Sequence, residues 1–359
     1  MMAGRFVEDV PPTMLSDLTG APRTDPLTIY RFRDGMYAAD LLTAAIARLD
    51  FFSWLADHPA DKATICAHFG TYDRPTDVML TLFAAMQYVE SKGGVFHLTP
   101  VAREHLVKSS PWFIGPYFAA LQERPVCRGF VEVLRTDRVA NWAGLEGHKD
   151  WHESMSDASF AAAFTAAMDC RGRYLGQALA RSIDLSSHER VLDIAGGSGI
   201  YACALVAAYP HLRATVLERA PVDRVAARSI AERGFAEGID VAAADMFADA
   251  WPTGADVHLL SNVLHDWGER DVRRLLERSF AALPDGGRVV VHDAFVNREK
   301  NGPLPVAQYS ALLMHSTQGK CHSIGEYEAL LESIGFVDVE YAPTAADRGR
   351  MVARKPPVR

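Results

Sequence analysis

The stretch from Arg190 to Asp223 constrains the fold more than any other part of the 359-residue sequence. It begins with the apolar run Val191 to Ile194, whose β-branched residues are typical of a buried parallel strand. This run ends in Gly196-Gly197-Ser198-Gly199. Glycines at this place let backbone N–H groups approach a ligand closely, so the turn predicts a binding loop.

The residues after the turn complete a recognisable unit. Residues 200–209 are rich in alanine and stop before Pro210, as a helix would. A second apolar run, 214–217, then places Glu218 at the end of a second strand. An acid about 20 residues after the glycine turn can accept hydrogen bonds from ribose hydroxyls. The order of strand, glycine turn, helix, strand and acid therefore predicts a nucleotide-binding βαβ unit.

The glycine turn alone does not identify the nucleotide. Gly197, Gly199 and Ala202 also satisfy the pattern G-x-G-x-x-A, so an NAD-type interpretation is open at this point. Two later segments bear on the choice. Residues 241–244 predict a strand that leads to Asp245-Met246-Phe247, and residues 256–262 predict another that leads to Leu264-His265-Asp266-Trp267.

With these motifs the chain resembles the class I S-adenosylmethionine (SAM) methyltransferases of the two-domain, small-molecule O-methyltransferase type. Five motifs carry the resemblance: Asp193 with Gly196, Gly197 and Gly199; Glu218 with Pro221; Asp245-Met246-Phe247; His265-Asp266-Trp267; and Leu283-Pro284-Asp285-Gly286-Gly287. The resemblance spans most of the chain, from residue 30 to residue 355. It implies that Glu218 holds the ribose, Asp245 and Met246 the adenine, and the glycine turn the methionine end. Asp193 and Ser261 are further expected contacts of SAM.

The length of the chain and the resemblance together predict more than one domain, because 359 residues exceed one ordinary core. We expect an α/β fold: a Rossmann-like, mostly parallel SAM-methyltransferase sheet of about seven strands, with a mainly helical, winged-helix dimerisation domain before it. The expected parts are a flexible lead-in over 1–26, the winged-helix-like domain over 27–105, a helical substrate-lid and linker segment over 106–183, and the catalytic domain over 184–359.

The expected winged helix has two interpretations from different classes. Apolar residues recur at helical spacing in 28–57, 62–69 and 76–86, and a hairpin is predicted over 88–98. A third helix that read DNA would need basic residues, but 76–86 offers Asp77 and the whole chain carries a net charge of −8. In the resembled family this region forms dimers. We therefore expect a homodimer that binds no nucleic acid, and a SAM-sensing regulator is disfavoured.

Nothing in the sequence predicts a membrane segment. No apolar stretch approaches the roughly 18 residues that a spanning helix needs, and residues 1–25 lack the apolar core of a signal peptide. The five cysteines are scattered and odd in number, which fits reduced thiols. These features predict a cytoplasmic protein.

Residues 100–175 are rich in aromatic residues and methionine. In the resembled family this segment roofs the substrate. We expect Phe164 and Met168, together with Met314, to contact the substrate. An anionic substrate could meet a cation of this segment, and Arg128 ranks first, ahead of Arg124 and Arg171, because its neighbours Cys127 and Phe130 are apolar.

His265 matches the general base of the resembled O-methyltransferases, in which this histidine takes the proton of a hydroxyl. A neutral imidazole with a pKa near 6.5 suits that role. The sequence departs from the phenol O-methylating pattern at the two glutamates that buttress the histidine, since Asp293 and Cys321 stand in their places. A cysteine cannot hold an imidazole as a carboxylate does at neutral pH.

Histidines and aspartates accumulate at adjoining strand ends: His265, Asp266, His292, Asp293 and His315. Imidazoles and carboxylates with open positions suit Zn²⁺ or Fe. The stretch 312–321 and the sequence His-Asp-Ala-Phe at 292–295 resemble a narrower group, the α-keto acid C-methyltransferases. A metal chelated by the oxygens of a 2-oxo acid would stabilise the enolate that attacks the methyl group of SAM.

These residues lead to a specific expectation. His265, His315 and His292 would ligate a divalent metal, Zn or Fe, and Asp266 or Asp293 would orient a ligand or act as base. Neighbours on a strand point to opposite faces, so only one of His292 and Asp293 can face the crevice. The sequence thus favours C-methylation of the β-carbon of a 2-oxo acid in natural-product biosynthesis. The alternative is O-methylation of a phenolic or polyketide hydroxyl with His265 as general base.

Overall fold

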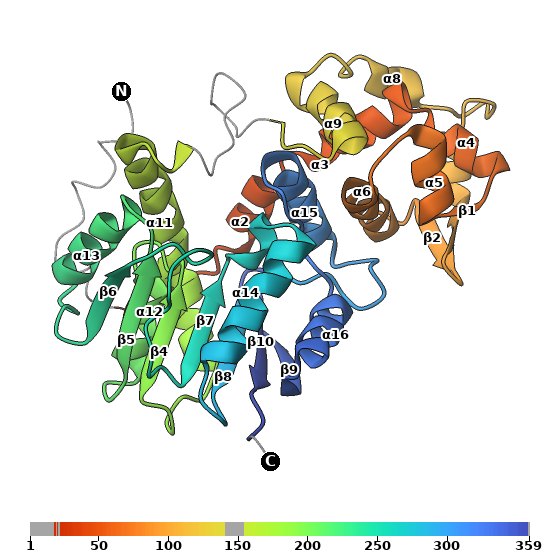
Figure 1. The fold of residues 1–359 in the computed structure, drawn as a ribbon. Coiled ribbons are helices and arrows are strands. Elements are labelled where there is room, and N and C mark those ends of the chain that lie inside the picture. The colour runs from red at the N-terminus through yellow and green to blue at the C-terminus, as the bar shows by residue number, and fades with distance from the viewer. Residues whose placement is uncertain (1–17, 19, 21, 141–153, 358–359) are drawn as a thin grey trace.

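The structure is a computed structural model that describes residues 18, 20, 22–140 and 154–357 (Figure 1). Most of the expected lead-in over 1–26 lies outside the described residues, as do residues 141–153 of the expected lid segment. The described chain forms an α/β sheet domain and a mainly helical N-terminal region, which lies at the upper right of Figure 1. The expected α/β fold, with a mostly parallel seven-stranded sheet and a mainly helical N-terminal region, is confirmed.

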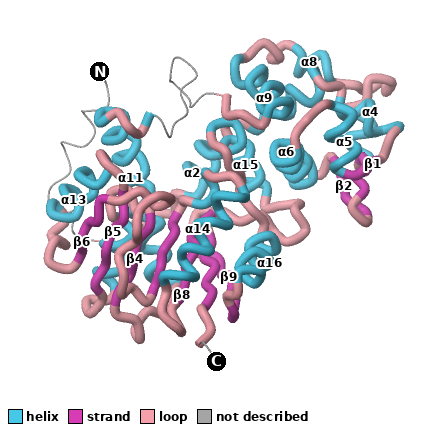
Figure 2. The backbone as a smooth tube through the Cα atoms, viewed as in Figure 1, coloured by secondary structure: helices cyan, strands magenta, loops and turns pink. Residues whose placement is uncertain are grey.

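A seven-stranded sheet forms the centre of the larger domain (Figure 2). Its strands are β4 (Arg190–Ile194), β5 (Arg213–Glu218), β6 (Ile239–Ala243), β7 (Val257–Ser261), β8 (Arg288–Asp293), β9 (Val337–Pro343) and β10 (Gly349–Arg354). Their order is β6-β5-β4-β7-β8-β10-β9. The five strands from β6 to β8 pair in parallel, whereas β10 pairs antiparallel with both β8 and β9.

Helices cover both faces of this sheet because its central strands are apolar on both sides. On β4, Val191 packs toward α11 and α12, and Leu192 packs toward α14 and α16. Alternation of side chains along a strand produces this division. The helices of the domain are α11 (Ala158–Ser182), α12 (Ile200–Ala208), α13 (Val222–Glu232), η2 (Leu264–Asp266), α14 (Glu269–Ala282), α15 (Leu304–Ser316) and α16 (Ile324–Ile334).

The N-terminal region consists of short helices and a small sheet in the order β1-β3-β2. Its elements are α2 (Leu27–Asp34), α3 (Ala38–Thr43), η1 (Ala44–Arg48), α4 (Phe51–Asp57), β1 (Ala60–Asp61), α5 (Lys62–Phe69), α6 (Asp73–Ala85), β2 (Val89–Lys92), β3 (Val95–Leu98), α7 (Pro100–His105), α8 (Gly115–Ala119) and α9 (Pro125–Thr136). The helical spacing over 28–57 is interrupted at Gly35, which ends α2, and at Asp50, whose φ is 54°. Sequence periodicity did not reveal these breaks, because both flanks keep the helical period.

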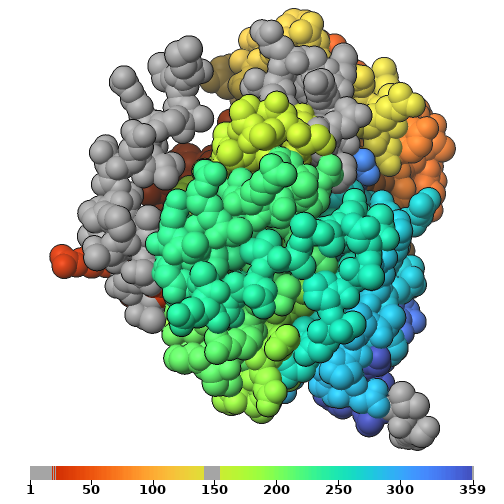
Figure 3. All heavy atoms as spheres, turned by 60° about the vertical axis from the view of Figure 1, so that its left-hand side comes forward, coloured from red at the N-terminus to blue at the C-terminus, as the bar shows by residue number. Residues whose placement is uncertain are grey.

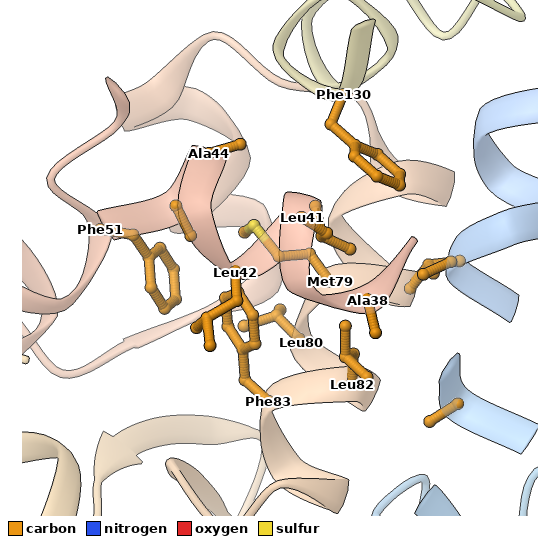
Figure 4. Packing of buried hydrophobic residues seen from close by; sticks show 14 of the residues in the cluster. Ala38, Leu41, Leu42, Ala44, Phe51, Met79, Leu80, Leu82, Phe83 and Phe130 are labelled. Atoms are coloured by element: carbon orange, nitrogen blue, oxygen red, sulfur yellow. The ribbon is translucent and has the colours of Figure 1, made fainter. Parts of the chain in front are cut away.

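The helical core does not stop at the end of the N-terminal region (Figure 4). Leu41 of α3, Leu82 of α6 and Phe130 of α9 belong to the same buried cluster as Leu312 of α15. Residues 75–83 of α6 are buried throughout. The apolar face of α6 is therefore packed into this shared core and is not presented at the surface.

Two further features bear on the setting of the protein. In the described parts of the chain, no helix combines the length and the apolar character that crossing a bilayer requires. All five cysteines are free thiols, and three of them (Cys127, Cys203 and Cys321) are buried.

Candidate active site

A pocket opens above the carboxyl ends of the parallel strands. Its floor comes from the residues that follow β4, β5, β6 and β7, and α11 and α15 supply its walls. In Figure 3 the yellow-green residues of α11 lie directly above the green residues of the sheet domain. Ligands of open α/β sheets bind at this edge, where successive crossovers leave a crevice.

The glycine turn and Glu218 form one end of the pocket. Gly197 and Gly199 adopt φ values of 62° and 75°, which side chains other than glycine rarely tolerate. The backbone N–H of Gly197 donates to Glu218 Oε1 over 3.0 Å, and that of Arg219 donates to Oε2 over 2.9 Å. Burial raises the pKa of Glu218 to about 7, against the effect of these two donors. The acid is thus fixed beside the turn with its carboxylate on the pocket wall.

Asp193 lies beneath the glycine turn and does not line the pocket. It is fully buried, and a Cβ on Gly196 would come within 2.6 Å of its Cγ. Burial raises its pKa to about 7. The resemblance predicts that Asp193 contacts SAM, whereas the described pocket is lined by Gly196, Gly197 and Ser198 at this point.

Asp245, Met246 and Phe247 form a second wall. The Asp245 carboxylate accepts from the backbone N–H of Phe247 over 2.7 Å, which holds the turn after β6 in place. All three residues line the pocket, and Phe247 packs edge-on against Trp267 with ring centroids 4.7 Å apart. The arrangement offers an apolar slot beside a carboxylate, which is suitable for a purine ring.

His265 and Asp293 meet at the far side of the pocket. His265 belongs to η2 after β7, and Asp293 ends the neighbouring strand β8, so the parallel register brings them together. Nδ1 of His265 lies 2.5 Å from Oδ1 of Asp293, and Nε2 lies 3.6 Å from Oδ1 of Asp266. Burial lowers the pKa of His265, but the carboxylates of Asp293 and Asp266 outweigh that effect and hold it above its ordinary value.

His292 points away from this pair, as alternation along β8 requires. Its Nδ1 lies 3.0 Å from Ser261 Oγ and its Nε2 lies 3.1 Å from Thr344 Oγ1. Both ring nitrogens are therefore used in hydrogen bonds. Burial lowers the pKa of His292 to about 3, so the ring is neutral. Ser261 itself lines the pocket.

His315 does not reach the pocket. Its ring packs between Tyr37 and Phe130, with centroids 5.1 and 4.9 Å away, and neither of its nitrogens has a hydrogen-bond partner. Within residues 18–140 and 154–357 as far as they are described, no three His, Cys, Asp or Glu side chains are grouped as metal ligands. His265, His292 and His315 thus do not form the ligand set expected from the sequence, because each faces a different neighbourhood.

The expected substrate contacts divide into two groups. Phe164 and Met168 of α11 line the pocket. Met314 is fully buried in the core that joins α15 to the helical region. Arg128 lies on the surface of α9 with its side chain 58% exposed, 3.9 Å from Glu123. Its apolar neighbours Cys127 and Phe130 are buried on the other side of the helix. The sequence expectation that Arg128 would be partly buried beside them was therefore wrong.

Sequence reasoning missed several polar residues of the pocket. Tyr309 of α15 packs edge-on against His265, with ring centroids 5.6 Å apart. Asn262 donates from Nδ2 to the hydroxyl of Tyr201 over 2.9 Å. Tyr309, Asn262 and Tyr201 all line the pocket. Arg171, which ranked below Arg128, lines it as well and donates to Tyr309 Oη over 3.2 Å. No local motif marks Tyr309, because its place depends on how α15 packs.

Comparisons with known proteins agree with this geometry. A family model described as the O-methyltransferase domain matches residues 130–337. A 3-hydroxy-5-methyl-1-naphthoate 3-O-methyltransferase of Streptomyces sahachiroi is 32% identical over 330 residues, which cover 91% of this chain and 90% of that protein. An L-tyrosine C(3)-methyltransferase of Streptomyces lavendulae is 29% identical over 310 residues, 84% of each chain.

A solved structure shares the whole architecture. An O-methyltransferase family 2 protein from Planctomyces limnophilus, in complex with apigenin, superposes with a TM-score of 0.85 at 30% identity. The match covers 94% of this chain and 98% of that one. The likeness therefore includes both the sheet domain and the helical N-terminal region.

Proposed function

The chain belongs to the O-methyltransferase family and is a SAM-dependent methyltransferase of small molecules; from that premise we propose that it methylates a phenolic hydroxyl, with His265 as general base. This is the alternative that the sequence left open, and the relatives support it better than C-methylation of a 2-oxo acid. The S. sahachiroi protein is named for a 3-O-methylation and the P. limnophilus protein was solved with a flavone-type phenol.

The pocket fits SAM in the way that the resemblance implies. Glu218 would hold the ribose hydroxyls, since its carboxylate is fixed on the pocket wall by two backbone donors. Asp245, Met246 and Phe247 would hold the adenine, and the glycine turn would hold the methionine end. When bound, SAM supplies a methyl group on a positively charged sulfur, ready for an in-line displacement.

The chain's own contribution is to position the acceptor and take its proton. A phenol has a pKa near 10 and is a weak nucleophile while protonated. Nδ1 of His265 is held by Asp293, and this pairing selects the tautomer whose Nε2 carries the lone pair. Nε2 can then accept the hydroxyl proton, and the imidazolium that forms is stabilised by the Asp293 and Asp266 carboxylates. The observation that carries the proposal is this buried His–Asp pair on the wall of the pocket that holds Glu218.

The proposal is tested with purified protein, SAM and a panel of phenols that includes a hydroxynaphthoate and a flavone. Mass spectrometry reports the gain of one methyl group, and NMR of the product distinguishes a methyl ether from a new carbon–carbon bond. We expect a methyl ether, and we expect His265→Asn to lower its rate by about 10²–10⁴-fold. A product methylated on carbon, or full activity of His265→Asn, would contradict the proposal.

C-methylation remains the second candidate, since the S. lavendulae relative is named for a C-methylation. It is decided by the same preparation, incubated with a panel of 2-oxo acids with and without a chelator. The metal-ligand role that the sequence predicted for His315 is tested by His315→Ala, which should leave activity unchanged because His315 packs among aromatic rings outside the pocket lining. Chelator-sensitive C-methylation that His315→Ala abolishes would establish this alternative. Chelator-insensitive methylation of a phenol favours the main proposal.

We also propose that the chain forms a homodimer through its N-terminal helices. Ile29, Phe32 and Met36, in α2 and directly after it, are 74%, 81% and 53% exposed. A group of neighbouring apolar side chains with such large exposed fractions is typical of a surface that another chain covers. Size-exclusion chromatography with light scattering should give twice the chain mass. Phe32→Glu should shift the protein to the monomer, whereas a monomeric wild type would overturn the proposal.

A further inference from the structure

Arg171 is a cation of the pocket wall without a carboxylate partner. It lies in α11 and lines the pocket, yet among the described residues it forms no salt bridge, and the carboxylate of Asp34 acts on it only from a greater distance. Its Nη1 donates to Tyr309 Oη over 3.2 Å, and its Nε is buried without a hydrogen-bond partner. A guanidinium carries five N–H donors, and those withdrawn from water are normally satisfied. The side chain therefore has donor capacity that the described chain does not use.

Other arginines near this end of the molecule are paired. Arg348 stacks over the ring of Tyr309, with its Cζ 4.4 Å from the ring centroid, and it pairs with Asp34 over 3.0 Å. Arg33, which also lines the pocket, lies 3.3 Å from the same carboxylate. Asp34 pairs directly with both of these cations and acts on Arg171 only from beyond salt-bridge distance, so among the described residues the guanidinium of Arg171 has no carboxylate in direct contact.

Tyr309 places Arg171 close to the proposed base. The tyrosine holds Arg171 through its hydroxyl and packs its ring edge-on against His265, with centroids 5.6 Å apart. The base and the cation are thus separated by one side chain along the same wall. The charge of Arg171 also opposes protonation of His265, although the two carboxylates beside the imidazole outweigh it. A ligand that contacts His265 Nε2 with a hydroxyl can therefore present a second group to Arg171.

From this arrangement we propose that the acceptor is an aromatic hydroxy acid whose carboxylate binds Arg171 while its hydroxyl meets His265. A planar carboxylate matches the guanidinium fork, which favours two parallel hydrogen bonds. The apolar side chains of Phe164, Met168 and Leu312 line the same pocket and suit the ring between the two groups. The inference rests on the proposed O-methylation: the phenolic proton passes to His265, the new O–CH₃ bond forms as the S–CH₃ bond breaks, and the sulfonium becomes a neutral thioether.

The test compares a hydroxynaphthoate with its methyl ester, which keeps the ring and the hydroxyl but removes the negative charge. With the wild-type protein we expect a KM for the acid that is about 10–10²-fold below that for the ester, as for a charge-assisted hydrogen bond. Arg171→Met should raise the KM for the acid by about the same factor, with a smaller change in kcat and with the KM for the ester unchanged. Arg171→Lys should recover part of the affinity, because it restores the charge without the fork.

Arg181→Met is the matched control, because Arg181 is exposed in the last turn of the same helix and does not line the pocket. It should leave both KM values unchanged. SAM affinity measured by calorimetry reports whether Arg171→Met is folded, and the comparison of acid and ester in the wild type does not depend on any variant. Equal KM values for acid and ester, or an equal rise of both in Arg171→Met, would overturn the assignment of Arg171 while leaving O-methylation intact. Failure to form a methyl ether from any phenol would instead defeat the proposed function, and this inference with it.

Discussion

Nδ1 of His265 lies 2.5 Å from Oδ1 of Asp293, and both side chains are almost fully withdrawn from solvent. The sequence placed an aspartate where the resembled enzymes have a glutamate, and the shorter side chain still reaches the imidazole. It does so because η2 follows β7 directly and Asp293 ends the adjacent strand β8. The pair keeps the His–acid relationship without the second glutamate, whose place Cys321 takes in a buried position outside the pocket lining.

The first prediction concerns the pH dependence that this pair imposes. The carboxylates hold the pKa of His265 above its ordinary value near 6.5, and a general base works only when neutral. In the wild type, kcat/KM should therefore rise with pH through a midpoint above 6.5. In Asp293→Asn burial is no longer outweighed, so the midpoint should move to lower pH, and the plateau should fall by on the order of 10²-fold because the imidazolium loses its partner. Initial rates from pH 5 to 9 measure both effects.

His265→Asn is the control for this prediction, since it should remove the rise of kcat/KM with pH altogether. In the wild type, Asp293 stays ionised over the whole range, because the charge of His265 and the hydrogen bonds to its carboxylate hold its pKa low against burial. A midpoint that stays in place in Asp293→Asn would show that another group sets the profile.

The second prediction concerns the cofactor end of the pocket. Glu218 is fixed by the N–H groups of Gly197 and Arg219, so its carboxylate is already oriented for the ribose. Glu218→Gln keeps the shape but removes the charge, and at pH 8, above the pKa of about 7 of Glu218, the affinity for SAM should fall by about 10–10²-fold, as expected for hydrogen bonds to a charged acceptor. Isothermal titration calorimetry measures the change. Glu232→Gln, on the exposed end of α13, should bind SAM as the wild type does, and equal affinities of both variants would contradict the role of Glu218.

Much of the sheet domain follows from the sequence, because its signals are local. The strand β4, the glycine turn, the helix α12 and the acid that ends β5 were all predicted from runs of neighbouring residues. The shared core of α15 and the helical region was not predicted, since it depends on contacts between residues far apart in the chain. The same limit explains the site: His265 and Glu218 belong to local motifs, whereas Tyr309 and Arg171 meet only after α15 and α11 have packed.

The misplaced metal ligands have a related cause. His265, His292 and His315 follow or occupy elements that end near the same edge, which made a cluster plausible from the sequence. Side-chain direction decides otherwise: His292 alternates away from Asp293 on β8, and His315 faces Phe130 across the helical core. The direction in which a side chain points from its helix or strand is fixed by the elements that pack against it. A single sequence does not show which elements those are.

The third prediction concerns Gly319, which lies in the stretch that resembled the keto acid enzymes. A Cβ at this position would come within 2.0 Å of the carbonyl oxygen of His265 and 2.8 Å of the backbone nitrogen of Trp267. Gly319→Ala must therefore displace η2 and with it the imidazole. We expect a loss of stability of about 1–3 kcal/mol and a fall in kcat that exceeds the change in SAM affinity. Denaturant unfolding and initial rates measure the two effects.

Gly325→Ala is the control, because its Cβ would meet nothing closer than 3.8 Å and alanine favours the helix α16. Similar behaviour of the two variants would contradict the steric explanation.

The last prediction concerns how α2 is attached beside the pocket. Two ion pairs join α2 to the loop between β9 and β10: Asp34 with Arg348 over 3.0 Å and Arg31 with Asp347 over 2.8 Å. The first pair is buried, whereas the Arg31 side chain is 45% exposed. Removing one partner of a buried pair leaves an uncompensated charge, so Asp34→Asn should lower the free energy of unfolding by about 3–5 kcal/mol. Asp347→Asn should cost only about 0–1 kcal/mol, because water screens the exposed pair.

Urea unfolding followed by circular dichroism compares the two variants at equal net charge. If both lose the same small amount, burial of the Asp34–Arg348 pair does not govern the attachment of α2. If Asp34→Asn alone is strongly destabilised, the pair anchors the helix whose Arg33 lines the pocket.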